Sequence, residues 1–345
     1  MPIETTFASG ASRGYGKGNG GEGGILLPFP FTVTTSKTGR LGPTSTEELI
    51  MTNYVPGLLI SKQQDTGIFM ITLTAGTYDM VASGASGATG TGAGLSSQIP
   101  GYPARASGRY TFTGPTKLLL LVGQRAINNM TSSQDGPGGG GTFIVKSPGN
   151  SSSSTAYTSI NISDALLVGG GSGMTDNSGY SNNVNASTNN NGGQGSGGVN
   201  PNYGGTNGYG GQHGCGAGAA GLLGNGGEAS AGAAHGGATC GSSTNISAGD
   251  FTTVTGGWEN SSAFKRGGMG GSYSSSAGGF GGGAPTGNNG FGGGGGYSGG
   301  GSTYSNSQYS GGGGSFAGNG ATNASIVLGS SRNVSGFITI TQIIL

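Results

Sequence analysis

The sequence predicts an all-β protein in which a long Gly-rich insertion separates two groups of strands. Three observations lead to this prediction. Alternating apolar and polar residues recur on both sides of the insertion. No window has the apolar spacing of an α-helix, and Gly residues within the insertion recur at every third position.

The predicted strands begin after residue 63, as short alternating segments bounded by turn residues. TGIFMITLTAGTYDMVASGA has a turn at Ala75-Gly76, and RYTFTGPTKLLLLVGQ has one at Gly114-Pro115. GTFIVKS and DALLVGGG follow, and SIVLGSSRNVSGFITITQIIL closes the chain. The strands are predicted near 67–74, 77–83, 108–113, 117–123, 141–147, 164–171, 325–328 and 336–344.

The Gly-rich insertion, at about 169–321, has its clearest period in GGFGGGAPTGNNGFGGGGGYSGG. Gly recurs every third residue from Gly278 to Gly299, with Ala284 as the exception. Three residues per turn is the period of a polyproline II helix, whose backbone groups point outward and need partners. We therefore predict a bundle of such helices. Gly290, Gly293 and Gly296 should share one packed face, with the adjacent Tyr297 outside it.

The composition excludes several classes of protein. Thirteen basic and twelve acidic residues leave a net charge of +1, so no basic face is present for nucleic acid. Twelve Pro are too few for collagen, although 84 of the 345 residues are Gly. A hydrophobic content of 32% also differs from that of a charged disordered tail.

The first part of the chain, 1–62, is predicted to be an N-terminal attachment segment preceding a domain over 63–345. In ILLPFPFTVTT, Pro28 and Pro30 alternate with apolar residues, as in an edge strand or a polyproline II segment. This segment either packs on its own domain or docks on a partner. The candidate attachment residues are Ile25, Leu26, Leu27, Phe29 and Phe31.

The sequence offers no signal for membrane insertion or secretion. MPIETTFASG lacks a basic region followed by an apolar one, and the longest apolar stretches, 25–31 and 118–122, are too short to span a bilayer. We therefore expect no membrane span and assembly in a cytosol.

Few residues in the sequence suggest a metal site, a cofactor site or a catalytic site. The two His and two Cys lie in one segment, as His213, Cys215, His235 and Cys240. Their spacing fits no common zinc finger, so we predict no metal. A Cys215–Cys240 disulfide and two free thiols both stay open. The many G-x-G strings lack the Gly-Lys-Ser/Thr sequence or βαβ setting of a phosphate-binding loop. We predict no cofactor and no enzymatic activity.

Aromatic residues gather in the Gly-rich part among Ser, Asn and Gly. One interpretation is that they cap helix ends and cover the sides of the bundle. The other is a binding surface, because Tyr and Trp in such loops are typical of adaptable recognition surfaces. The candidate binding-tip residues are Tyr180, Tyr203, Tyr209, Phe251, Trp258 and Tyr304.

The sequence resembles a known family across roughly 65–345. The strings TGIFMITLTAGTYDMVASGASGA, ARASGRYTFTGPTKLLLLVGQ, GPGGGGTFIVKS, ALLVGGGSGM, FGGGGGYSGGG and GFITITQI occur in the order found in the glycine-rich domain of the anaplastic lymphoma kinase and leukocyte tyrosine kinase receptors. The resemblance implies a tumour-necrosis-factor-like β-sandwich carrying a bundle of polyglycine II helices. Because the chain has no kinase or transmembrane segment, it does not imply receptor signalling.

A second resemblance concerns the setting. TTFASGASRGYG is similar to short starts of bacteriophage and giant-virus structural proteins, and the Gly-rich composition is similar to that of phage tail-fibre adhesins. These resemblances imply a non-enzymatic virion protein, such as a fibre, spike or decoration subunit, assembled in the host cytosol.

The expected partners follow from the interpretation as a virion protein. They are other particle proteins at the N-terminal segment, a host-surface glycan or protein at the tips, and further copies of the chain. The alternative is a cellular extracellular ligand-binding or matrix module. A third class, RNA-associated Gly-rich proteins, is disfavoured by the near-neutral charge.

Overall fold

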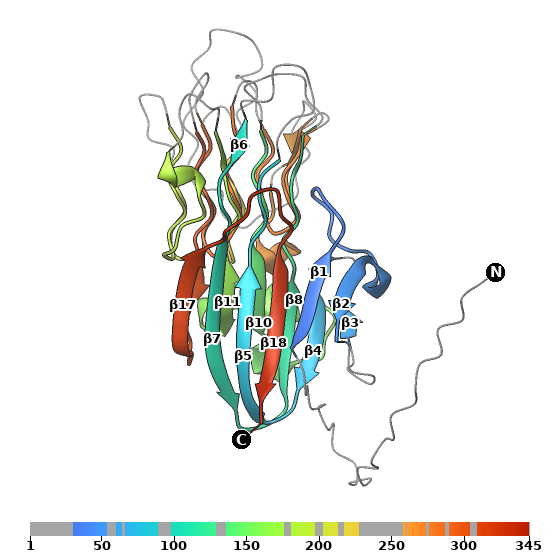
Figure 1. Ribbon diagram of the computed structural model, residues 1–345. Helices are drawn as coiled ribbons and strands as arrows, with labels where there is room; N and C mark the ends of the chain where they lie inside the picture. The colour runs from blue at the N-terminus through green and yellow to red at the C-terminus, as the bar shows by residue number, and fades with distance from the viewer. Residues whose placement is uncertain are drawn as a thin grey trace, which may run out of the picture.

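The protein is an all-β molecule with two six-stranded antiparallel sheets packed together as a sandwich (Figure 1). The computed structural model describes residues 30–53, 60–63, 66–88, 98–128, 136–175, 181–196, 203–212, 217–227, 258–259, 261–273, 276–286, 290–303 and 309–344. Within these ranges the helical elements are short 3-10 turns: η1 Thr46–Glu48, η3 Pro148–Asn150, η4 Ala156–Ser159, η5 Ile162–Asp164, η6 Asn182–Val184 and η8 Phe264–Arg266.

Each large sheet combines strands from distant parts of the chain. The first has the order β17-β7-β5-β18-β1-β2, formed by Thr322–Leu328, Ala104–Phe112, Gly76–Ser83, Phe337–Ile343, Phe31–Thr35 and Leu49–Thr52. The second has the order β16-β11-β10-β8-β4-β3, formed by Phe316–Ala317, Ala165–Gly169, Thr142–Lys146, Thr116–Leu121, Phe69–Leu73 and Ile60–Lys62.

Two small sheets lie outside the sandwich. One pairs β6 (Ile99–Pro100) with β12 (Met174–Thr175). The other has the order β13-β14-β15-β9, formed by Trp258–Glu259, Ser272–Tyr273, Ser276–Ala277 and Ile127–Asn128.

All eight strands predicted from the sequence are present, with ends that shift by a few residues. The predicted boundary at residue 62 is wrong, because β1, β2 and β3 belong to the two sheets. β1 lies between β18 and β2, with Phe31 opposite Ile340 and Val33 opposite Met51. Pro30 precedes β1, so the strand loses no ladder hydrogen bond to proline. From Phe31 onward, the chain is part of the sandwich.

The main core lies between the two large sheets. Alternate residues of β1, β5 and β18 point inward, and Phe31, Tyr78, Met80 and Ile340 are buried there. They meet Leu118, Leu120 and Ile144 from the second sheet. This period-two pattern is the one that predicts a strand with one buried face.

A second apolar cluster covers the outer face of the second sheet. Phe143 of β10 packs on Phe264 with ring centroids 5.1 Å apart, and Phe280 and Tyr297 join the same cluster. Every residue of β8 is therefore buried, on both faces of the strand. Burial on both sides explains the continuous apolar run Leu118–Leu121, which has no alternation.

Tyr110 of β7 ties the two sheets together through its hydroxyl. The O–H donates to the carbonyl oxygen of Leu166 at 2.6 Å and lies 3.0 Å from that of Gly318. Burial raises the pKa of this phenol well above its ordinary value, because the interior disfavours the phenolate.

Tyr110→Phe is expected to lower the free energy of unfolding by about 1–3 kcal/mol, because buried acceptors lose their donor. A raised folded-state pKa stabilises the protein below the unfolded pKa, near 10, and that stability is lost as pH rises further. Urea unfolding at pH 7 and above pH 10 tests both effects. Tyr203→Phe, at a tyrosine that is 53% exposed, should leave the free energy of unfolding at pH 7 unchanged. A loss shared by the two variants would contradict the prediction.

Candidate functional site: the Gly-rich layer and its polar hollow

A layer of Gly-rich segments extends from one end of the sandwich (Figure 1). Several of these segments continue a strand: 84–88 follows β5, 170–175 follows β11, and 309–315 precedes β16. The C-terminus lies at the opposite end of the molecule (Figure 1). β1 runs antiparallel to β18. The chain therefore enters the sandwich at Phe31 from the end where β18 finishes, which is the end away from the Gly-rich layer.

Backbone hydrogen bonds join the segments of this layer. The N–H groups of Gly138, Gly139 and Gly140 donate to three different segments, at Ala284, Ser172 and Gln124. Bonds between the same two segments recur every three residues. Gly138 and Gly141 donate their N–H groups to the carbonyl oxygens of Ala284 and Gly281. In the same way, Gly292 and Gly295 donate to Gly136 and Gly139. Gly294 and Tyr297 donate to Gly311 and Gly314.

Many glycines of the layer are packed closely against the backbone of a neighbouring segment. A Cβ atom on Gly293 would lie 2.2 Å from the carbonyl oxygen of Gly300. On Gly294 it would lie 2.2 Å from that of Gly171, and on Gly295 2.2 Å from that of Gly281. The prediction that one face of each helix is packed is therefore too narrow. Three consecutive glycines each contact a different neighbour.

Tyr297 is also placed differently from the prediction. Its side chain is 3% exposed and its ring stacks on Phe316, with centroids 4.5 Å apart. Its N–H donates to the carbonyl oxygen of Gly314 at 2.8 Å. Tyr297 is a core residue at the junction of the layer and the sandwich.

Three of the six predicted binding-tip residues lie within the described residues. Tyr203 and Tyr209 are 53% and 55% exposed on one hairpin of the layer, closed by a bond from the N–H of Gln212 to the carbonyl oxygen of Tyr203. Trp258 lies in β13, which pairs with β14. Tyr180, Phe251, Tyr304, and the cysteines Cys215 and Cys240 lie outside the described residues.

Of the five predicted attachment residues, Phe31 lies within the described residues. Phe31 is fully buried between the sheets, which leaves it no surface for a partner. Ile25, Leu26, Leu27 and Phe29 lie outside the described residues.

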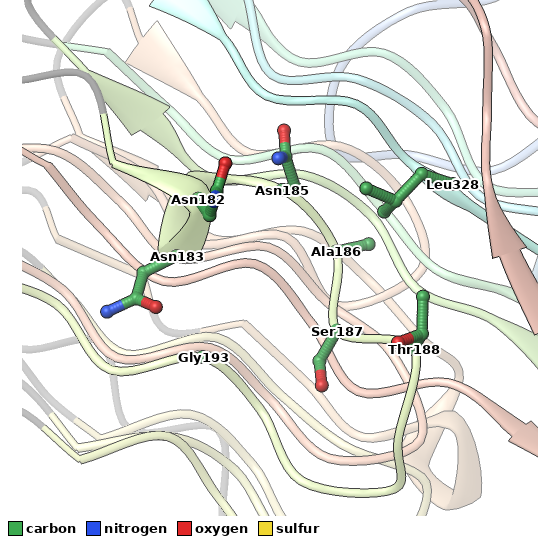
Figure 2. Close-up of a pocket in the computed structure, with 8 residues that line it drawn as sticks. All are labelled: Asn182, Asn183, Asn185, Ala186, Ser187, Thr188, Gly193 and Leu328. Carbon is green, nitrogen blue, oxygen red and sulfur yellow. The ribbon is translucent and has the colours of Figure 1, made fainter.

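A hollow of about 380 Å³ opens at the side of the layer, where segment 182–193 meets the end of β17 (Figure 2). Asn182, Asn183 and Thr188 are exposed along it. Figure 2 shows Leu328 across from this segment, on the β17 side. The lining residues are Asn182, Asn183, Asn185, Ala186, Ser187, Thr188, Gly193 and Leu328.

Hydrogen bonds from side chains and backbone fix the polar wall of this hollow. Ser181 caps η6 by accepting a hydrogen bond from the N–H of Asn183. Asn185 Oδ1 accepts from the N–H of Tyr102 at 2.9 Å, and the N–H of Ala186 donates to the carbonyl oxygen of Tyr102 at 2.8 Å. The N–H of Ser187 donates to the carbonyl oxygen of Gly313. The exposed side chains therefore project from a segment held at both ends.

The lining groups of the hollow are amides, hydroxyls and small apolar side chains, and none of them titrates. The guanidinium of Arg332 is directed at the nearby Tyr102 ring, 4.4 Å from its centroid. Neutral donors and acceptors next to Leu328 suit a ligand that is uncharged, rich in hydroxyl groups and partly apolar.

The binding-tip prediction relies on aromatic residues, so it does not include the amide side chains that line this hollow. The Asn run of SNNVNASTNNN was the available signal. Leu328 could not be found in this way, because it reads as one more apolar residue of a strand.

No protein-family profile matches this chain, and no curated protein matches it either. What the structure defines is the class: an all-β protein with two packed six-stranded antiparallel sheets. In the described part of the chain, no helix has the length and apolarity needed to cross a membrane. No three His, Cys, Asp or Glu side chains gather into a metal site within those residues.

Proposed function

We propose that the chain is a non-enzymatic structural and adhesive protein of a virus particle, held at one end and binding the host surface through its Gly-rich layer. The observation that carries this proposal is the uncharged, amide-lined hollow on a layer held rigidly by backbone hydrogen bonds. Rigid scaffolds with variable polar surfaces suit recognition, since little ordering entropy is lost on binding.

We further propose that the layer is a bundle of polyglycine II helices on a tumour-necrosis-factor-like sandwich, as the family resemblance implies. Two features support the helices. Bonds to a given neighbour repeat every three residues, and consecutive N–H groups donate to different neighbours. The two packed antiparallel sheets are consistent with the sandwich.

The ligand that fits the hollow best is a neutral glycan. Sugar hydroxyls can pair with the exposed amides of Asn182 and Asn183, while Leu328, at 41% exposed, offers an apolar contact for a sugar face. Because no charge lines the hollow, binding there should depend weakly on salt.

The glycan part is tested with the labelled full-length chain on an array of neutral and sialylated glycans. Neutral glycans should bind, and 0.5 M NaCl should leave binding unchanged. The double variant Asn182→Ala/Asn183→Ala should weaken binding about tenfold, since two hydrogen bonds are lost at about 0.5–1.5 kcal/mol each. The control Ser152→Ala/Ser154→Ala removes two exposed hydroxyls outside the layer and should bind normally. Equal affinities for the two double variants would rule out the hollow.

The virion part is tested by mass spectrometry of purified particles. Peptides of this chain should be present, and deletion of residues 1–29 should reduce its incorporation. That deletion spares β1, whose Phe31 belongs to the core. Absence of the chain from particles, or normal incorporation of the shortened chain, would contradict the corresponding part of the proposal.

A further inference from the structure

β17 forms one edge of the first sheet and is unusually exposed. It pairs with β7 on one side, and no strand lies on its other side in the described part of the chain. Six of its seven residues are exposed, and only Ile326 is half-buried. The last four residues, Ser325–Leu328, form a regular ladder with Ser107–Ala104 and so present a straight row of backbone groups outward.

The other edges of the two sheets are short. β2 has four residues, β3 three and β16 two, whereas β17 has seven. Natural edge strands are usually protected by charge, proline or a bulge. β17 contains no charged residue and no proline, and its one irregularity lies at the start, between Thr322 and Ser325.

Apolar side chains are exposed on both faces of β17. Val327 is 51% exposed and Leu328 is 41% exposed, and neighbours along a strand point to opposite faces. The edge strand of the opposing sheet, β16, is too short to cover the inner side of β17. This edge therefore has both unpaired backbone groups and apolar side chains available to a partner strand.

We propose that β17 pairs with β17 of a second copy of this chain, joining the two first sheets into one continuous antiparallel sheet. Two antiparallel copies of one strand are self-complementary about a twofold axis. With the axis at Val327, the two Val327 side chains face each other, and Ile326 of each copy faces Leu328 of the other. Because Leu328 also lines the hollow, a bound glycan and the second copy compete for this side chain. In this register a charge at the axis position would lie directly opposite the same charge of the other copy, which is unfavourable. The uncharged sequence TNASIVL avoids this repulsion.

The first test is the mass of the full-length chain in solution by light scattering. The wild-type protein should have a mass near twice 33.2 kDa at tens of micromolar, and Val327→Glu should reduce it to a single chain. Within one chain the new carboxylate lies opposite Arg105 of β7, which favours the folded monomer, whereas two carboxylates meet at the axis. Ile50→Glu, at a residue 50% exposed on the edge strand β2, is the matched control and should stay dimeric.

A second measurement does not depend on a loss of association. In a chain carrying Cys215→Ser and Cys240→Ser, Val327→Cys should form a disulfide-linked dimer on oxidation, because directly opposed residues bring their Cβ atoms within about 4.5–5.5 Å. Ile50→Cys in the same background should not. A monomeric wild type, a trimer, an assembly that Val327→Glu leaves intact, or equal crosslinking of the two Cys variants would each overturn the proposal.

Discussion

Replacing Gly293 by alanine is expected to lower the free energy of unfolding by about 3 kcal/mol or more. The added methyl group would lie 2.2 Å from the carbonyl oxygen of Gly300, closer than any real contact of a Cβ atom. The obstacle is backbone, and it belongs to a network of hydrogen bonds between Gly-rich segments, so it cannot rotate away as a side chain could. Relief requires two segments to separate and their bonds to break.

The matched control for this variant is Gly114→Ala. No atom lies within 4 Å of a Cβ built on Gly114, and its φ is not positive. Alanine there should stabilise the protein by about 0.4–1 kcal/mol by restricting the unfolded chain. Urea unfolding monitored by circular dichroism compares the two variants. Equal urea midpoints for the two variants would show that the layer has room for a side chain at Gly293 and is not closely packed there.

Tyr297→Val is expected to cost about 3–5 kcal/mol, the usual penalty for removing a large buried aromatic side chain. The ring is 3% exposed, stacks on Phe316 and belongs to the cluster that covers the second sheet. Its loss leaves a cavity where the layer meets the sandwich, so both parts should unfold at lower temperature. This expectation reverses the one drawn from the sequence, which placed Tyr297 outside the packed face.

Tyr209→Val is the control for this second variant. Tyr209 lies in the same Gly-rich layer but is 55% exposed, so its replacement should change stability by less than about 0.5 kcal/mol. Differential scanning fluorimetry separates the two expectations. A small shift for Tyr297→Val, similar to that of Tyr209→Val, would mean that the ring does not help to join the layer to the sandwich.

The strands could be predicted from the sequence because their chemistry is local. β5, β7 and β18 alternate inward and outward residues, Ala-Gly marks the turn from β4 to β5, and Gly-Pro marks the turn from β7 to β8. The prolines before FTVTT suggested an edge strand or a polyproline II segment, whereas β1 is an inner strand between β2 and β18. Its partner residues in β18, Phe337–Ile340, lie about 300 residues away in the chain. Pairing over such a distance has no local signal.

The Gly-rich layer and the hollow were predictable to different degrees. A period of three in the sequence reappears in the backbone hydrogen bonds, as from Gly292 and Gly295 to Gly136 and Gly139. The sequence could not predict how many neighbouring segments pack against each Gly-rich segment. That number depends on which segments the fold brings together. The hollow depends on bringing together Leu328 and Asn182, which both line it and are 146 positions apart in the chain.

The central position of β18 has a consequence for how the protein is made. β18 lies between β1 and β5, yet ribosomes synthesise it more than 250 residues after either strand. Until Phe337–Ile343 leaves the ribosome, β1 and β5 each have an open edge on the side where β18 will insert. The first sheet therefore closes only after translation has passed its last strand, as is typical of slow folding dominated by non-local pairing. Chains that terminate early keep two unpaired edges, and such edges recruit other strands into aggregates.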